Sequence, residues 1–315
     1  MDAIRKVPEL SLLSFVNGTN TDKQRFVDNL FAGLKDYGFI VLVDHTVDEK
    51  VTKKAYELTH EFFQMSVEKK QKYVCSVGGG QRGYTAFGVE HAKNNQYPDL
   101  KEFWHVGREK LVDEKFRPIF PPNIWPTEIP EFRETMLSLF NSLDTSASLI
   151  MDALGLALDV PQSFFRNMLQ DGNSILRPIH YPPMHANAPK NAVRAAAHED
   201  INLITVMVGA TTSGLELLDR DGKWLPVRNN EKQLVVDTGD MLQVLTNGLL
   251  PATTHRVVNP SNFNDTRYSM PFFTHPNPDT MLSCIPSCRG TGEKYEPINS
   301  HEFLMQRLKE IGLKK

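Results

Sequence analysis

Cysteine is scarce in this chain of 315 residues, which contains only three, Cys75, Cys284 and Cys288. An odd and sparse set cannot build a disulfide framework, so a disulfide-rich secreted scaffold is excluded. The spacing of Cys284 and Cys288 could suit a metal, but no second cysteine pair accompanies them, and we expect free thiols. No secretory apolar stretch follows the first residues, which favours a cytoplasmic protein.

Two further absences narrow the class of protein. No apolar run approaches the roughly 18 residues that a membrane-spanning helix needs. Positive and negative charges nearly balance, with 35 Lys and Arg against 38 Asp and Glu, so no basic field for nucleic acid is present. The stretch Gly78-Gly79-Gly80 lacks the Lys-Ser or Lys-Thr of a phosphate-binding loop and is expected to form a mobile loop. We therefore expect no membrane and no nucleic-acid partner.

Helical patterns occupy the first half of the chain, and short strands occupy the second. Apolar residues recur with a helical period from Thr21 to near Gly38, from Asp48 through Phe63, and from Phe132 to Leu156. A short strand is expected at Phe39 to Val43, and from Ser174 onward short strands alternate with turns. Evenly spaced short strands favour a jelly roll over a parallel sheet. The predicted fold class is mixed α and β, a double-stranded β-helix core with N-terminal and central helices packed on its larger sheet.

We expect the whole chain, 1–315, to form a single structural unit. Prolines punctuate a linker between the N-terminal part and the long helical pattern. The expected portions are an N-terminal α/β portion (1–125), scaffold helices (126–172), the jelly-roll core (173–280) and a C-terminal tail that covers the site (281–315).

The most informative motif is His198-Glu199-Asp200, followed much later by His255. Residues i and i+2 of a strand point to the same face, so His198 and Asp200 can reach one metal ion together. His255 would supply the third ligand from a distant strand. Two neutral imidazoles and one carboxylate form the facial triad of non-haem Fe(II) oxygenases, which leaves positions open for a co-substrate and O2.

Other interpretations of these residues remain open at this point. A lone His-Xaa-Asp arises by chance, and both histidines could be ordinary core or surface residues. Both lie at predicted strand ends among apolar neighbours, where an unpaired ionisable group is costly, and this favours a metal site. A zinc-dependent hydrolase would use the same three ligands but needs a nearby general base. A non-catalytic jelly-roll binding protein would need no triad.

The chain resembles the isopenicillin N synthase-like branch of the Fe(II)/2-oxoglutarate-dependent dioxygenases over nearly its whole length. The motifs that carry the resemblance follow the family's order: Tyr37-Gly38-Phe39, Gly83-Tyr84, Asp99-Leu100-Lys101-Glu102, Leu176-Arg177-Pro178-Ile179-His180-Tyr181-Pro182-Pro183, His198-Glu199-Asp200, Gly239-Asp240-Met241, His255-Arg256-Val257 and Arg267-Tyr268-Ser269. The resemblance implies a jelly-roll core and three cofactors or co-substrates, Fe(II), 2-oxoglutarate and O2. The implied reaction couples decarboxylation of 2-oxoglutarate to hydroxylation, desaturation or ring closure of a small organic substrate.

The resemblance also assigns a 2-oxoglutarate clamp. Arg267 would bind the far carboxylate, because a guanidinium fork matches a carboxylate and stays charged when buried. Ser269 would add a hydroxyl from the same face of the strand, and Tyr181 matches the family tyrosine that completes the clamp. Isopenicillin N synthase carries the same Arg-Xaa-Ser pattern but holds its substrate with it, so an oxidase that uses O2 without 2-oxoglutarate is the alternative.

The substrate is the least determined part of the sequence. The family's variable surfaces correspond to residues 82–108 and 281–313 of this chain. The first segment offers Arg82, Tyr84, Phe103 and His105 as candidate substrate-binding residues, a mixture of aromatic walls and cationic ends suited to a modest organic molecule. Phe103 could equally belong to the core.

Overall fold

The computed structural model describes residues 5–75, 80–90, 98–183, 193–260, 262 and 264–310. The predicted glycine-rich loop falls partly outside these ranges, since Gly78 and Gly79 are not among the described residues.

Eight α-helices are found in the described ranges. They are α1 (Leu12–Asn17), α2 (Asn20–Asp36), α3 (Glu49–Phe63), α4 (Val67–Gln71), α5 (Phe132–Ala157), α6 (Ser163–Leu169), α7 (Asp240–Leu245) and α8 (Ser300–Glu310). The three long helices match the predicted periodic segments. Helix α2 begins slightly earlier than predicted because Thr19, not Thr21, caps it, in a reciprocal capping box with Asp22.

The strands form two main sheets and one small one. They are β1 (Glu9–Ser11), β2 (Phe39–Asp44), β3 (Gly83–Thr85), β4 (Glu102–Gly107), β5 (Ile175–Leu176), β6 (Ile179–Tyr181), β7 (Ala195–His198), β8 (Ile204–Val208), β9 (Leu215–Leu218), β10 (Trp224–Pro226), β11 (Leu234–Thr238), β12 (His255–Val257), β13 (Arg267–Thr274), β14 (Met281–Leu282) and β15 (Ile298–Asn299). Within the described chain, the larger sheet has the order β1-β2-β11-β8-β13-β5-β4-β3, with β6 pairing β13 and β4, and the smaller sheet has the order β10-β9-β12-β7.

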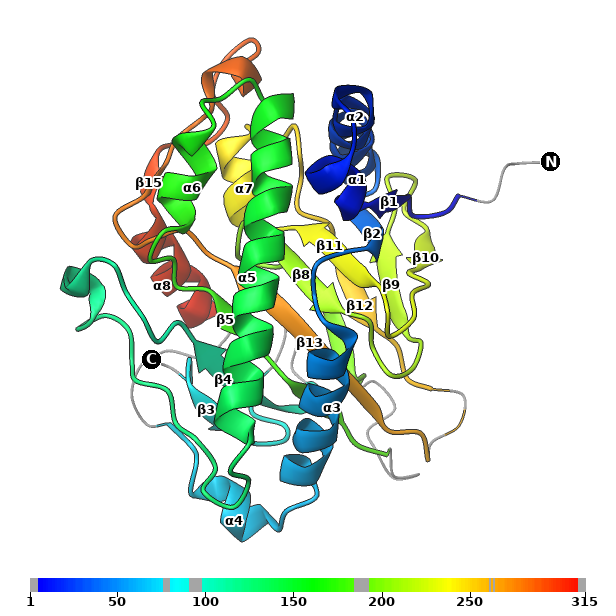
Figure 1. Ribbon diagram of the computed structural model, residues 1–315, viewed down its shortest axis with the longest axis vertical. Helices are drawn as coiled ribbons and strands as arrows, with labels where there is room; N and C mark the ends of the chain where they lie inside the picture. Colours follow the sequence, from blue (N-terminus) through cyan, green and yellow to red (C-terminus); the bar gives the residue numbers. More distant parts are fainter. Residues whose placement is uncertain are drawn as a thin grey trace.

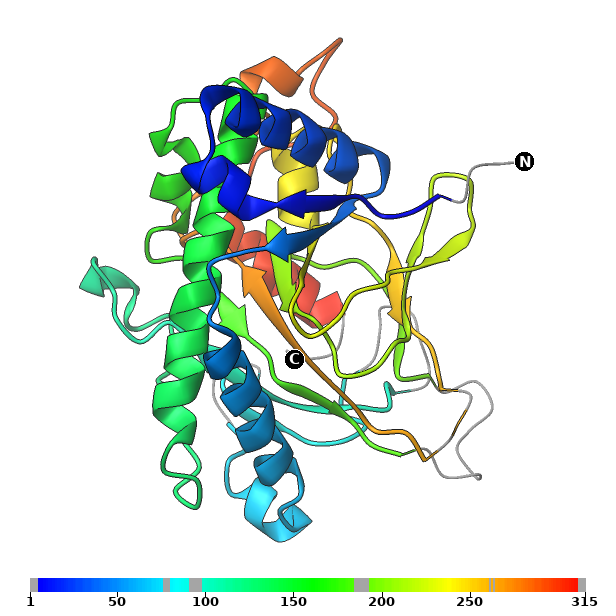
Figure 2. The ribbon, with the colours of Figure 1, turned by 45° about the vertical axis from the view of Figure 1, so that its right-hand side comes forward.

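The predicted fold class is confirmed, because the helices cover the outer face of the larger sheet and the smaller sheet faces its inner side. Figure 1 shows α5 running along the molecule in front of the sheet, with α3 beside it and α2 near one end. Figure 2 shows α5 and the strands of the smaller sheet on opposite sides of the larger sheet. The N-terminal portion supplies β1 to β4 to the larger sheet, so it shares that sheet with the jelly-roll strands.

Successive side chains of a single strand point alternately into two separate apolar cores. On β11, Leu234 and Val236 belong to the core under the helices, whereas Val235 belongs to the core between the sheets. On β13, Met270 and Phe272 pack under the helices. The residues between them therefore point into the space between the two sheets, where the site lies.

Two local features differ from the pattern of strands and turns expected after Ser174. Residues 240–245 form helix α7, because fewer than two turns of helix carry too little periodicity to be recognised in the sequence. Ile201 and Leu203 do not extend β8, which begins at Ile204. The backbone there turns because the amide of Met241 donates to the carbonyls of Ile201 and Asn202. In the part of the chain that the structure describes, no helix is long and apolar enough to cross a membrane.

Candidate active site

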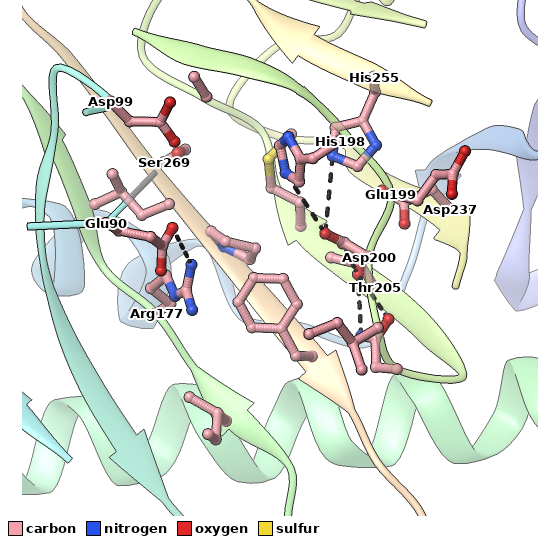
Figure 3. A pocket seen from close by; sticks show the side chains of 18 of the residues that line it. Glu90, Asp99, Arg177, His198, Glu199, Asp200, Thr205, Asp237, His255 and Ser269 are labelled. Atoms are coloured by element: carbon pink, nitrogen blue, oxygen red, sulfur yellow. Dashed lines mark hydrogen bonds and ion pairs between the residues drawn. The ribbon is translucent and has the colours of Figure 1, made fainter. Parts of the chain in front are cut away.

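The smaller sheet brings the three predicted metal ligands together. His198 ends β7 and His255 begins β12, and the two residues are direct partners across the antiparallel pair. Asp200 follows β7 by two residues and places its Oδ1 atom 3.8 Å from Nε2 of His198 and 3.9 Å from Nε2 of His255. One ligand atom from each residue lies within 4.8 Å of the others, and Figure 3 shows the three side chains converging.

Hydrogen bonds to the backbone fix the orientation of both imidazoles. Nδ1 of His198 lies 2.7 Å from the carbonyl of Ala196, and Nδ1 of His255 lies 3.1 Å from the carbonyl of Thr253. A carbonyl accepts only, so each ring carries its hydrogen on Nδ1 and presents the Nε2 lone pair toward Asp200. This tautomer is the one that a metal ion requires, so the donor set fits Fe(II).

The electrostatics of the cluster keep His255 and Asp200 in their metal-binding protonation states. Burial, together with the nearby His198, lowers the pKa of His255 to about 4, so this imidazole is neutral at pH 7. Burial alone would raise the pKa of Asp200, but the two histidines and a hydrogen bond from Thr205 hold it below its usual value. The hydroxyl of Thr205 donates to Oδ2 of Asp200, and the amide of Asn202 in turn donates to that hydroxyl.

A pocket of about 390 Å³ opens beside the cluster, between the two sheets. Its volume lies within the usual range for small-molecule sites, roughly 300–1,000 Å³. The predicted clamp residues Arg267, Ser269 and Tyr181 all line it. Arg267 on β13 is the direct partner of Tyr181 on β6, and its guanidinium lies 5.0 Å from the centre of the tyrosine ring.

The Arg267 side chain is buried, with 1% exposure, and lacks a carboxylate partner among the described residues. Its Nη1 donates to the hydroxyl of Ser269 over 3.2 Å, and its Nε donates to the carbonyl of Thr212 over 3.3 Å. A buried guanidinium without a counter-ion is costly, so this end of the pocket is built to receive an anion.

The wall across the pocket from the metal cluster carries a second cluster of charged side chains. Figure 3 shows Glu90, Asp99 and Arg177 on this side, opposite His198, Asp200 and His255. The ammonium of Lys101 lies 2.7 Å from Oε1 of Glu90 and 2.9 Å from Oδ2 of Asp99, and Nη1 of Arg177 lies 3.3 Å from the same Glu90 oxygen.

Of the four candidate substrate-binding residues, only His105 lines the pocket. Nδ1 of His105 lies 2.8 Å from the carbonyl of Gly80, and its Nε2 accepts a hydrogen bond of 2.5 Å from Nε of Arg177. Burial lowers the pKa of His105 well below its usual value, so the ring is neutral. Both ring nitrogens are thus engaged by the protein.

The structure places Arg82, Tyr84 and Phe103 outside the pocket lining. Arg82 is fully buried, packs against Gly107 and donates to the carbonyl of its neighbour Gln81, and burial lowers its pKa to about 10. The Tyr84 hydroxyl donates to Glu102 over 2.5 Å. Phe103 lies in the core between the sheets, with the Arg177 guanidinium 4.5 Å above its ring. Residue type alone could not separate pocket walls from core residues in this segment.

Several pocket residues were missed by the sequence reasoning. Arg177 lies within a recognised motif, whereas Glu90 and Thr205 lie outside the motifs named above, and nothing in the spacing of the three residues indicates a role. The C-terminal helix α8 also lines the pocket. The lining residues from α8 are Leu304, Arg307, Leu308 and Glu310.

Two family models match the chain. Residues 7–128 match the N-terminal region of the non-haem dioxygenases of morphine synthesis, and residues 172–276 match the 2OG-Fe(II) oxygenase superfamily. The second match contains the metal cluster and the clamp.

Individual relatives cover almost the whole chain. A 2-oxoglutarate-Fe(II) type oxidoreductase of Emericella nidulans is 29% identical over 96% of this chain and 89% of its own length. Homoarginine-6-hydroxylase of Arabidopsis thaliana is 30% identical over 84% of this chain and 80% of its own length. A 2OG-Fe(II) oxygenase family protein of Caulobacter crescentus superposes with a TM-score of 0.86 at 41% identity, covering 97% of this chain and 99% of that one. A full-length protein of Neurospora crassa, in complex with alpha-KG and thymine, superposes with a TM-score of 0.86 at 27% identity over 96% of both chains.

Proposed function

Because this chain belongs to the 2OG-Fe(II) oxygenase superfamily, we propose that His198, Asp200 and His255 hold its Fe(II) and that Arg267, Ser269 and Tyr181 hold its 2-oxoglutarate. The protein is an Fe(II)/2-oxoglutarate-dependent oxygenase that acts on a small molecule. Membership of this family leaves no role for the alternatives of a zinc hydrolase or a non-catalytic binding protein.

The observation that carries the clamp assignment is the buried guanidinium of Arg267, which has no carboxylate counter-ion among the described residues. The far carboxylate of 2-oxoglutarate would provide the missing counter-ion through a bidentate contact. Ser269 supports this because its hydroxyl already accepts from the guanidinium and has its own hydrogen available for the same carboxylate. The Tyr181 ring lies against the guanidinium and restricts its orientation.

When bound, Fe(II) and 2-oxoglutarate supply the activation of O2 and the oxidising power, as in the rest of the family. The chain's own residues do the positioning. The Ala196 and Thr253 carbonyls fix the histidine tautomers, Thr205 orients the Asp200 carboxylate, and Leu304 and Leu308 of α8 exclude water from one side of the pocket.

Relatives act on or bind chemically different small molecules, including proline in a hydroxylase of Petromyces alliaceus and thymine in the Neurospora crassa protein. The proposed reaction of this chain is the hydroxylation or a related oxidation of a compact polar molecule that shares the pocket of about 390 Å³ with 2-oxoglutarate. We place the enzyme in the cytoplasm, which the three cysteines support because none of them forms a disulfide in the described ranges.

The proposed ligands are tested by anaerobic titration of the metal-free protein with Fe(II), followed by 2-oxoglutarate. The wild type should bind both and develop a weak visible charge-transfer band when 2-oxoglutarate chelates the metal. His255→Ala should lose most of the Fe(II) affinity, whereas Arg267→Gln should keep Fe(II) affinity and lose 2-oxoglutarate affinity. Unchanged Fe(II) binding in His255→Ala would refute the metal assignment, and substrate oxidation by the wild type without any oxo acid would refute the clamp assignment.

A further inference from the structure

Arg177 is held rigidly on the wall opposite the metal cluster. Its guanidinium lies between two aromatic rings, 4.5 Å from the centre of Phe103 and 4.8 Å from that of Phe273. Its Nε donates to the neutral ring of His105, and its Nη1 lies 3.3 Å from Oε1 of Glu90. A guanidinium has five N–H donors, and within the described chain the bonds of Arg177 use Nε and Nη1, which leaves the donors of Nη2 for a ligand. The side chain keeps 16% exposure and Arg177 lines the pocket, so part of this side chain is accessible from the cavity.

Beside the donor Arg177 lies a hydrogen-bond acceptor, the carboxylate of Glu90. The residue is buried, with 8% exposure, and its Oε1 atom receives both Lys101 and Arg177. Its Oε2 atom is buried and accepts no hydrogen bond from the residues that the structure describes. Burial alone would raise the pKa of Glu90, but Arg177 and Lys101 hold it below its usual value, so the group is a charged acceptor. Glu90 lines the pocket, and the terminal torsion of a glutamate is soft, so a small rotation can bring Oε2 to the cavity while Oε1 keeps its ion pairs.

The free acceptor of Glu90 and the free donors of Arg177 lie side by side, so together they are complementary to a ligand that has one donor next to one acceptor. We propose that Glu90 and Arg177 together recognise the substrate by one amide edge, in which an N–H donates to the Glu90 carboxylate and the adjacent C=O accepts from Nη2 of Arg177. This inference rests on the proposed function, because it places that edge across the pocket from the oxidising centre.

The geometry of the pair selects a class of amide. In a secondary amide, the N–H and the C=O point to the same side only when the amide is cis, which costs about 2.5–4 kcal/mol in an open chain. A ring of five or six members imposes the cis arrangement at no such cost. Among secondary amides, the pair therefore selects a cyclic amide, namely a lactam, imide or cyclic ureide. A carboxylate on the ligand would bind Arg177 but would be repelled by Glu90. An ammonium group would bind Glu90 but would be repelled by Arg177.

His105 acts as a positioning residue in this arrangement. Its Nδ1 hydrogen is committed to the Gly80 carbonyl, so its Nε2 lone pair can only accept, and it accepts from Arg177. The neutral ring therefore fixes the rotation of the guanidinium without adding charge.

The test is anaerobic calorimetric titration of the protein loaded with Fe(II) and 2-oxoglutarate, using 2-piperidone, 2-pyridone and uracil as probes. Each cyclic amide is compared with its N-methyl derivative, and benzoate and benzylamine serve as purely anionic and cationic probes. In the wild type at least one cyclic amide should bind, and N-methylation should weaken it on the order of tenfold or more, because the contact to a charged acceptor is lost. In Glu90→Ala and Glu90→Gln this preference for N–H over N-methyl should fall to about twofold or less. Arg177→Lys should weaken every cyclic amide about tenfold, because the lysine lacks the planar fork.

Matched controls come from the Arg166–Asp152 ion pair, which joins α6 to α5 outside the pocket. Asp152→Asn and Arg166→Lys should leave all probe affinities unchanged. Each variant is also titrated with Fe(II) and 2-oxoglutarate, and binding of both shows that the variant is folded. If the wild type itself binds neither Fe(II) nor 2-oxoglutarate, the proposed function fails, and this outcome is distinct from a failure of the amide inference. Tighter binding of benzoate or benzylamine than of every cyclic amide, an N-methyl preference that survives in both Glu90 variants, or no amide binding by an enzyme that holds Fe(II) and 2-oxoglutarate would each overturn the inference.

Discussion

The Thr205 hydroxyl donates to one oxygen of Asp200 while the other oxygen of that carboxylate faces both histidines. Thr205 lies on β8 of the larger sheet, whereas the histidines belong to the smaller sheet. The orientation of the proposed iron ligand is therefore set by the opposite sheet.

Thr205→Val should lower Fe(II) affinity about 10- to 100-fold, the usual consequence of removing a group that orients a metal ligand. Anaerobic Fe(II) titration measures the change. Thr205→Ser keeps the hydroxyl and should restore most of the affinity; equal affinity in the valine and serine variants would show that the hydroxyl has no such role.

Arg267→Lys should raise the apparent dissociation constant of 2-oxoglutarate about tenfold or more, because the lysine keeps the charge but cannot make a bidentate contact. Ser269→Ala should have a smaller effect, since it removes a single neutral donor. Binding is followed by the charge-transfer band at fixed Fe(II). A larger effect of Ser269→Ala than of Arg267→Lys would reverse the proposed roles.

Gly38→Ala should destabilise the fold and disturb His255. Gly38 has φ +67°, and a Cβ atom there would collide with the hydroxyl oxygen of Thr253, whose carbonyl holds the His255 ring. We expect a loss of about 2–5 kcal/mol in unfolding free energy from strain and overpacking. Gly222→Ala is the matched control, since Gly222 has φ +74° with no atom within 4 Å of the position of an added Cβ, and should cost only about 1–2 kcal/mol. Denaturant unfolding compares the two, and equal losses would contradict the steric argument.

His275 should make the metal-free protein sensitive to acid. Burial lowers the pKa of His275 to about 4, from an ordinary value of 6.5, so the folded state resists protonation that the unfolded state accepts. The stability contributed by the neutral ring is complete above pH 6.5 and is lost as the pH falls from 6.5 toward 4, by about 3 kcal/mol. The variant His275→Gln should lack this loss, so its free energy of unfolding relative to that of the wild type should rise as the pH falls from 6.5 toward 4. Parallel stability curves from pH 7 to pH 4 would exclude the effect.

The sequence predicted those parts of the fold that rest on local periodicity. Helix α5 and the cap of α3 at Asp48 follow directly from spacing and residue type. Arg267 and Ser269 share a face because both lie on β13. Asp200 lies beyond the end of β7, so its position beside His198 is not explained by the strand alternation on which the sequence-based expectation relied.

The opposite wall of the pocket could not be predicted, because tertiary pairing alone decides it. Arg177 reaches Glu90 and His105 through contacts between distant segments, and no period in the sequence encodes them. Tyr84 and Phe103 resemble pocket aromatics in composition, yet they turn into the protein interior on β3 and β4. Whether an aromatic residue faces a cavity or a core depends on the partner strand.

The pairing of β7 with β12 couples iron occupancy to the folding equilibrium. In the unfolded chain His198 and His255 are far apart, so only the folded state offers both imidazoles to one ion. Any ligand that binds the folded state alone stabilises it by mass action, by about 2.7 kcal/mol when its free concentration is 100 times its dissociation constant. Iron limitation would then reduce the lifetime of this protein as well as its turnover, because the metal-free chain unfolds more often and is exposed to proteases each time.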